Sequence, residues 1–64
     1  MDVSIVVPFW NEAGNLIRLS EALRAALSGQ SRSWEVLLVN DGSTDASVEE
    51  ALEIASADQR FRLI

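Results

Sequence analysis

Four side chains that could bind a ligand follow two apolar runs of the sequence. Trp10, Asn11 and Glu12 follow the first run, and Asp41 follows the second. If both runs are parallel strands, their carboxyl ends lie along the same edge of one sheet, where open α/β sheets bind ligands. These four residues are therefore candidates for a binding site rather than ordinary loop residues.

The chemistry of these side chains suits a nucleotide, although each has a plainer alternative. A carboxylate only accepts hydrogen bonds, so Asp41 fits the N–H edge of uracil or guanine, unless it merely stabilises its own turn. Trp10 could stack on a base or ribose, or it could be anchored in the core. Glu12 could bind a ribose hydroxyl or pair with Arg18. Because no glycine-rich phosphate-binding motif is present, side chains and the loop 8–12 would have to hold the ligand.

The neighbouring polar residues are predicted to be structural. Asn11 is a candidate N-cap for the first helix, and Ser43, Thr44 and Asp45 have the preferences of turn and cap residues. Trp34 begins the second strand at the opposite edge of the sheet, and we assign it to packing.

The composition narrows the function further. The 64 residues carry a net charge of −5 and include no lysine, histidine or cysteine. An acidic chain without a basic stripe argues against nucleic-acid binding. Carboxylates remain the strongest candidates for acid–base or metal chemistry. Four acids are expected to face water on the second helix and beyond it: Glu49, Glu50, Glu53 and Asp58.

The sequence shows no targeting or membrane segment. No apolar stretch approaches the ~18 residues that a membrane span requires, and no signal peptide is visible at the N-terminus. We expect a cytoplasmic protein, placed at the cytoplasmic face of a membrane if further residues attach it there.

The first half of the chain has the pattern of a strand followed by a helix. Residues 3–7 form an apolar, β-branched run that is typical of a strand covered on both faces, and Pro8 is expected to end it because proline has no N–H. A helix is predicted over residues 14–28 with Gly29 as its C-terminal cap. Its buried stripe is expected to contain Leu16, Leu19, Leu23 and Leu27, widened by Ile17 and Ala26.

The second half repeats the pattern. Residues 34–39 predict a central strand, Asp45 is a good N-cap for a second helix, and residues 61–64 begin a third strand. The buried stripe of that helix is expected to be Val48, Ala51, Leu52 and Ala55. The order is βαβαβ with crossovers suited to a parallel sheet. Since such a unit leaves an edge and helix faces open, we expect residues 1–64 to be a truncated part of a larger domain.

The two strand-to-loop segments resemble the opening of a family 2 glycosyltransferase with the GT-A fold. The first segment is Ser4-Ile5-Val6-Val7-Pro8-Phe9-Trp10-Asn11-Glu12, and the second is Glu35-Val36-Leu37-Leu38-Val39-Asn40-Asp41-Gly42-Ser43-Thr44-Asp45. Together they extend over most of the chain. The resemblance implies the N-terminal, nucleotide-binding half of a Rossmann-like domain, with parallel strands flanked by helices.

The resemblance also implies a function and a set of site residues. The family transfers a sugar from a nucleotide-diphosphate donor to an acceptor. The positions that match its nucleotide pocket are Pro8, Trp10, Glu12, Val39 and Asp41. In this interpretation Asp41 accepts the base N–H, Trp10 packs on the nucleoside and Glu12 fixes the loop.

This chain departs from the family pattern at two positions. Trp10 stands where tyrosine is commoner, and Asn40 replaces the first acid of the usual Asp pair. Neither change removes the acid that is matched to the base. The segment Asn11-Glu12 with Asn15-Leu16 favours enzymes that act on polyprenyl or dolichyl phosphate.

The resemblance further implies a divalent cation, Mg²⁺ or Mn²⁺, that offsets the charge of the diphosphate. Its ligands, the acceptor site and the catalytic base are expected outside residues 1–64. We therefore predict that these residues alone are inactive and prone to self-association. The alternatives are a receiver-like signalling module, which Pro8 after the first strand disfavours, and a degenerate product that only packs against a partner.

Overall fold

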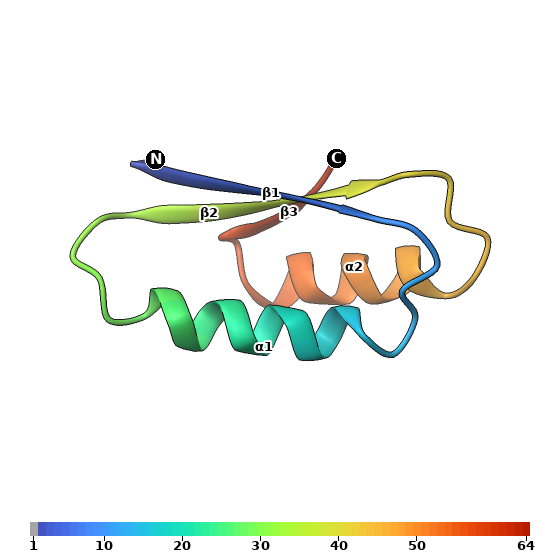
Figure 1. The fold of residues 1–64 in the computed structure, drawn as a ribbon, viewed down its shortest axis with the longest axis horizontal. Helices are drawn as coiled ribbons and strands as arrows, with labels where there is room; N and C mark the ends of the chain where they lie inside the picture. The colour runs from blue at the N-terminus through green and yellow to red at the C-terminus, as the bar shows by residue number, and fades with distance from the viewer. Residues whose placement is uncertain (1) are drawn as a thin grey trace.

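The computed structural model describes residues 2–64, which form one three-stranded parallel sheet and two helices. Their order along the chain is β1 (Val3–Phe9), α1 (Leu16–Leu27), β2 (Trp34–Asn40), α2 (Ser47–Ala57) and β3 (Phe61–Leu63). The strand order in the sheet is β1-β2-β3, so β2 is central as predicted (Figure 1). The α/β class and the βαβαβ order are confirmed.

The prediction that Pro8 ends the first strand is wrong, since β1 continues to Phe9. The Val3 N–H donates to Ser33 O, and Phe9 O accepts from Asp41 N–H. Odd-numbered residues of β1 therefore direct their backbone groups toward β2, whereas Pro8 directs its ring nitrogen to the outer side. No described strand pairs with that side. Because the missing N–H has no ladder bond to lose there, the strand tolerates proline.

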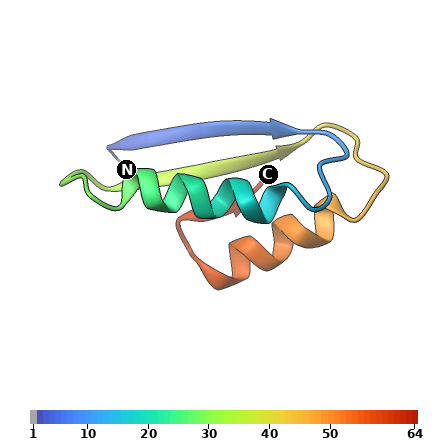
Figure 2. The ribbon, with the colours of Figure 1, turned by 60° about the horizontal axis from the view of Figure 1, so that its bottom comes forward.

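Both helices pack on the same face of the sheet, as two views of the molecule show (Figures 1 and 2). That face and the helices share the buried core, which consists of Phe9, Leu16, Trp34, Val36, Leu38, Ala51, Ile54 and Phe61. No helix of the described chain covers the opposite face, so the expectation that β1 is covered on both faces is wrong. We call that side the uncovered face; it carries Ser4, Val6, Pro8, Glu35, Leu37, Val39 and Arg62.

The predicted buried stripes of the helices are only partly correct. In α1, Leu16 is buried and Leu23 half-buried as expected, but Ser20 takes the place next to them while Leu19 is exposed. Ile17 and Ala26 of the same helix are exposed as well, and Leu27 is half-buried. In α2, Ala51 is buried as predicted, Leu52 is exposed, and the buried residues that the pattern missed are Ser47 and Ile54.

The caps also differ from the sequence predictions. The N-cap position of α1 is Asn15 rather than Asn11, and that of α2 is Ala46 rather than Asp45; neither Asn15 nor Ala46 makes a side-chain cap hydrogen bond. Ser28 is the C-terminal cap of α1, and Gly29 does not adopt a left-handed conformation. The Asp45 carboxylate nevertheless accepts a hydrogen bond from the Ser47 N–H at 3.0 Å, so it still satisfies one free N–H of the first turn of α2.

An ion-pair cluster closes the end of the molecule where β2 and β3 begin. Asp58 accepts hydrogen bonds from the Arg60 guanidinium at 2.9 and 3.0 Å and from Arg24 Nε at 3.2 Å. Arg60 stacks on Trp34, and the Trp34 ring meets Phe61 edge-on with centroids 5.8 Å apart. The prediction that Trp34 is a packing residue is confirmed, whereas the prediction that Asp58 faces water is wrong.

Candidate functional site

The loops that follow β1 and β2 lie side by side at the carboxyl end of the sheet. Phe9 and Asn40 are register partners, and the Asp41 N–H donates to Phe9 O at 2.9 Å, which extends the pairing one residue beyond β2. The Thr44 N–H donates to Asn11 Oδ1 at 2.8 Å. Because Trp10 lies between Phe9 and Asn11, Trp10 and Asp41 both lie at this carboxyl end of the sheet. We call this end, formed by the loops after β1 and β2, the rim.

Trp10 is exposed on this rim. Its relative exposure of 60 % rules out the alternative of a core anchor within the described residues. A large aromatic side chain that is mostly in water has an open face on which a flat ligand can stack. The following residue, Asn11, has a left-handed backbone with φ of 49°, which turns the chain sharply after Trp10.

Asp41 is exposed, and its turn does not depend on its own carboxylate. The side chain of Asn40 accepts the Ser43 N–H at 2.9 Å, and Gly42 supplies the positive φ of 78°. Within residues 2–64, no hydrogen bond or ion pair occupies the Asp41 carboxylate. Asn40 therefore serves the turn, and the Asp41 carboxylate stays exposed.

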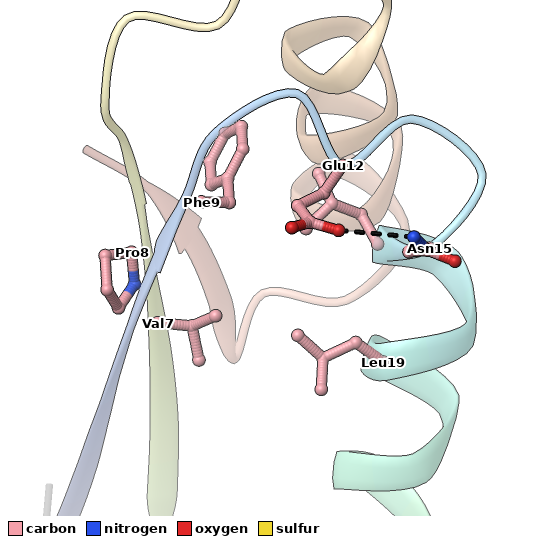
Figure 3. Close-up of a pocket in the computed structure, with 7 residues that line it drawn as sticks. Val7, Pro8, Phe9, Glu12, Asn15 and Leu19 are labelled. Atoms are coloured by element: carbon pink, nitrogen blue, oxygen red, sulfur yellow. Dashed lines mark hydrogen bonds between the residues drawn. The ribbon is translucent and has the colours of Figure 1, made fainter.

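Glu12 points away from the rim, toward the start of α1. Its carboxylate accepts a hydrogen bond from Asn15 Nδ2 at 3.2 Å (Figure 3). No ion pair of the described chain joins it to Arg18. A pocket of about 330 Å³ opens beside it, with the lining residues Val7, Pro8, Phe9, Glu12, Asn15, Leu16 and Leu19. This pocket is mainly apolar, and the Glu12 carboxylate is its one charged group.

The five predicted site residues thus fall into three neighbouring groups. Trp10 and Asp41 lie on the rim, while Pro8 and Val39 are register partners on the uncovered face. Glu12 lies on the helix side of the sheet, beside a pocket that Pro8 also lines, although it is only two residues from Trp10. All three groups lie near the rim, because the helix-covered face and the uncovered face of the sheet meet there.

Residues that sequence reasoning did not assign to the site hold the first loop in place. Four consecutive backbone N–H groups, from Asn11 to Gly14, each donate to a side chain of the second loop or of α2. We call these four side chains the acceptor cluster: Ser43, Asp45, Ser47 and Glu50. The prediction that Glu50 faces water is therefore wrong.

A signal for two members of the acceptor cluster was present in the sequence. Ser47-Val48-Glu49-Glu50 has the S-x-x-E spacing of a capping box, in which the serine and the glutamate satisfy the N-terminus of their own helix. In the structure Ser47 and Glu50 bond to the first loop instead. The spacing marks the right residues but does not reveal their partners.

The Asp45 carboxylate, within the acceptor cluster, accepts several hydrogen bonds that stabilise its ionised form. The Ser47 hydroxyl donates a short hydrogen bond to the Asp45 carboxylate, and backbone N–H groups of Ser47 and Ala13 also point at it. These donors, chiefly the Ser47 hydroxyl, lower the pKa of the Asp45 carboxyl. Asp45 therefore remains an ionised acceptor at neutral pH.

Neither a metal site nor a membrane-crossing helix is found in the described part of the chain. Residues 2–64 bring together no three acidic side chains that could hold a metal ion. The helices of this part are too short or too polar to cross a bilayer.

A parallel sheet built from one βαβαβ unit is the arrangement of one half of a Rossmann-like α/β domain. Within that class the sequence matches glycosyl transferase family 2 over residues 4–64, so the chain belongs to this family. The match disfavours the receiver-like alternative.

Curated bacterial relatives support the assignment. The chain is 41 % identical over 59 residues to the undecaprenyl-phosphate 4-deoxy-4-formamido-L-arabinose transferase of Pectobacterium carotovorum, covering 92 % of this chain and 18 % of the relative. A protein of the same name from Salmonella enteritidis is 43 % identical over 47 residues, covering 73 % of this chain and 14 % of the relative. The chain therefore spans less than a fifth of the length of these relatives.

Proposed function

We propose that the protein is a glycosyltransferase in which residues 1–64 bind the nucleotide part of a nucleotide-diphosphate sugar. The observation that carries this proposal is the pairing of an unoccupied Asp41 carboxylate with an exposed Trp10 on one rim, in a chain of glycosyl transferase family 2. A carboxylate that can only accept, beside a flat aromatic surface, suits the N–H edge and the face of a base.

Each predicted site residue has a role in this proposal. Asp41 accepts the base N–H, and Trp10 stacks on the nucleoside. Pro8 and Val39 offer an apolar surface where the rim meets the uncovered face. The role of Glu12 is indirect, since its carboxylate is hydrogen-bonded to Asn15 and shapes the start of α1.

We further propose a polyprenyl phosphate as the acceptor, because the relatives are named as transferases that act on undecaprenyl phosphate. Such a lipid would require the enzyme to work at a membrane surface. A divalent cation, Mg²⁺ or Mn²⁺, would offset the repulsion between the diphosphate and a chain of net charge −5. We place its ligands outside residues 1–64, and inactivity of these residues alone stays a prediction.

The test is calorimetric titration of the protein, at its full natural length, with UDP, GDP, CDP and ADP in the presence of Mg²⁺. Asp41→Ala should raise the Kd for the diphosphate that binds by about tenfold or more, since a hydrogen bond to a charged group contributes roughly 1.5–3 kcal/mol. The control is Glu49→Ala, which removes an exposed acid of α2 that bonds to no described residue.

Two results would overturn the proposal. One is that none of the four diphosphates binds to the unaltered protein. The other is that Asp41→Ala and Glu49→Ala weaken binding equally, since the effect would then come from net charge and not from a contact. Asp58 is unsuitable as a control because its two arginine partners make it a structural residue.

A further inference from the structure

We propose that Ser47 and Glu50 are positioning residues of the nucleotide site, which set the conformation of the loop carrying Trp10 and Glu12. The inference rests on the proposed function, since it concerns the same ligand. It assigns a role in binding to two residues of α2 that lie behind the rim and touch no ligand themselves.

The first argument is that residues from a distant part of the chain hold the backbone of the loop after β1. Its successive N–H groups donate to side chains that lie 32 to 36 residues further along the chain. The four distances are 3.1 Å from Asn11 to Ser43, 2.7 Å from Glu12 to Ser47, 3.2 Å from Ala13 to Asp45 and 2.7 Å from Gly14 to Glu50. The two shortest bonds involve Ser47 and Glu50, so α2 holds this loop most closely.

Ser47 is the central member of the acceptor cluster. Its side chain is fully buried, and its hydroxyl accepts from the Glu12 N–H while donating to the Asp45 carboxylate. Chains of hydrogen bonds in which each member is satisfied hold a single geometry. The backbone of Glu12 is thereby fixed relative to the start of α2.

Glu50 provides the second argument, because its placement is costly for folding. Its Oε2 accepts the Gly14 N–H, but its Oε1 is buried without a hydrogen-bond partner in the described chain. A buried carboxylate oxygen without a partner destabilises the folded state. Ser47 comes one residue after the N-cap position of α2, which is Ala46, so Glu50 lies one residue too far along the helix to complete a capping box, and its carboxylate bonds to the first loop instead. Its use on Gly14, which has a φ of 86°, indicates that the position of the loop is what matters.

These hydrogen bonds affect the position of Trp10, because the residues that they hold follow Trp10 directly in the chain. Asn11 adopts its left-handed turn between Trp10 and Glu12, and its N–H is held by Ser43. With the bonds to Glu12 and Gly14 in place, Trp10 lies on the rim in the absence of any ligand. Without them the loop would have to be ordered by the ligand, at a cost to affinity.

The test compares Glu50→Ala, Glu50→Gln and the matched control Glu49→Ala in the protein at its full natural length. The measurements are the Kd for whichever of UDP, GDP, CDP and ADP binds the unaltered protein, the urea midpoint, and amide hydrogen exchange of residues 11–14. We expect Glu50→Ala to raise Kd about tenfold and to speed exchange at Gly14. Glu50→Gln keeps an acceptor oxygen and should return Kd to within about threefold, while Glu49→Ala changes neither quantity.

Each other outcome overturns the inference in a recognisable way. An unchanged Kd in folded Glu50→Ala, even with a lower urea midpoint, would make Glu50 a merely structural residue. A Glu50→Gln variant as weak as Glu50→Ala would show that charge, not the bond to Gly14, is responsible. Failure of the unaltered protein to bind any diphosphate would defeat the proposed function and this inference together, whereas a defect confined to the variants concerns the inference alone.

Discussion

The ion-pair cluster around Asp58 should make the stability of the protein depend on pH in a defined window. The hydrogen bonds from Arg60, with a smaller attraction from Arg24, lower the pKa of the Asp58 carboxyl from 3.8 to about 2. Because the folded state binds the proton less tightly than the unfolded state, the cluster stabilises the protein above about pH 4. That contribution should disappear as the pH falls from about 4 to about 2.

The magnitude follows from this difference between the two pKa values. A fall from 3.8 to about 2 corresponds to roughly 2.4 kcal/mol at neutral pH. The carboxylate is well covered at 14 % exposure, but both arginine side chains are more than a third exposed, so solvent screening reduces the gain. We therefore expect Asp58→Asn to lower the free energy of unfolding by about 1–2 kcal/mol at pH 7.

Urea unfolding of the protein and of Asp58→Asn at pH 7, 5 and 3 measures this directly. The free energies of unfolding of the two proteins should differ at pH 7 and 5, and at pH 3 that difference should fall to about half. Glu49→Gln, at an exposed position of α2, should differ from the unaltered protein by less than about 0.5 kcal/mol throughout. A difference for Asp58→Asn that is the same at all three values of pH would refute the ion-pair explanation.

Three further substitutions test other parts of the structure. Trp34→Leu should lower the free energy of unfolding by about 2–4 kcal/mol, since it removes a buried ring packed on Phe61; a loss below about 1 kcal/mol in urea unfolding would contradict that packing. Gly42→Ala should cost about 1 kcal/mol through its φ of 78° alone, because the added Cβ meets nothing within 4 Å; unchanged thermal unfolding would argue against the left-handed turn. Trp10→Ala should raise the Kd for the bound diphosphate about tenfold with little change in stability, whereas Trp10→Phe should retain most of the affinity. Equal affinities of the two Trp10 variants would contradict stacking.

The order and type of the elements could be predicted because they depend on local patterns. The residue spacing that favours a strand or a helix is present in the local sequence, so β2 and α1 were predicted close to their observed bounds and α2 close to its observed start. The buried faces of the helices were harder to predict. A three-stranded sheet covers only a narrow strip of each helix, and here that strip includes Ser20 and Ser47 while Leu19 and Leu52 are left in water. Hydrophobicity alone ranks these residues the other way.

In the candidate site, too, some parts could be predicted from local patterns and others depend on packing. The strand-end rule and the family resemblance placed Trp10 and Asp41 together, and the structure puts both on one rim. Their use by a nucleotide remains a proposal. The acceptor cluster could not be predicted, because its bonds join loops more than thirty residues apart whose relative placement is set by packing. The S-x-x-E spacing of Ser47 and Glu50 could have drawn attention to both residues, but it does not reveal that their partners lie in the first loop.

The proline near the end of β1 affects how the sheet can grow. Along the outer side of β1, Ser4 and Val6 present N–H groups, but Pro8 has none. A strand that docked there could pair with the first part of β1 and would lose a hydrogen bond just before the rim. Edge-to-edge polymerisation is therefore weakest beside Trp10. The pyrrolidine ring of Pro8 would thus help to keep the entrance to the proposed nucleotide site clear of other backbones.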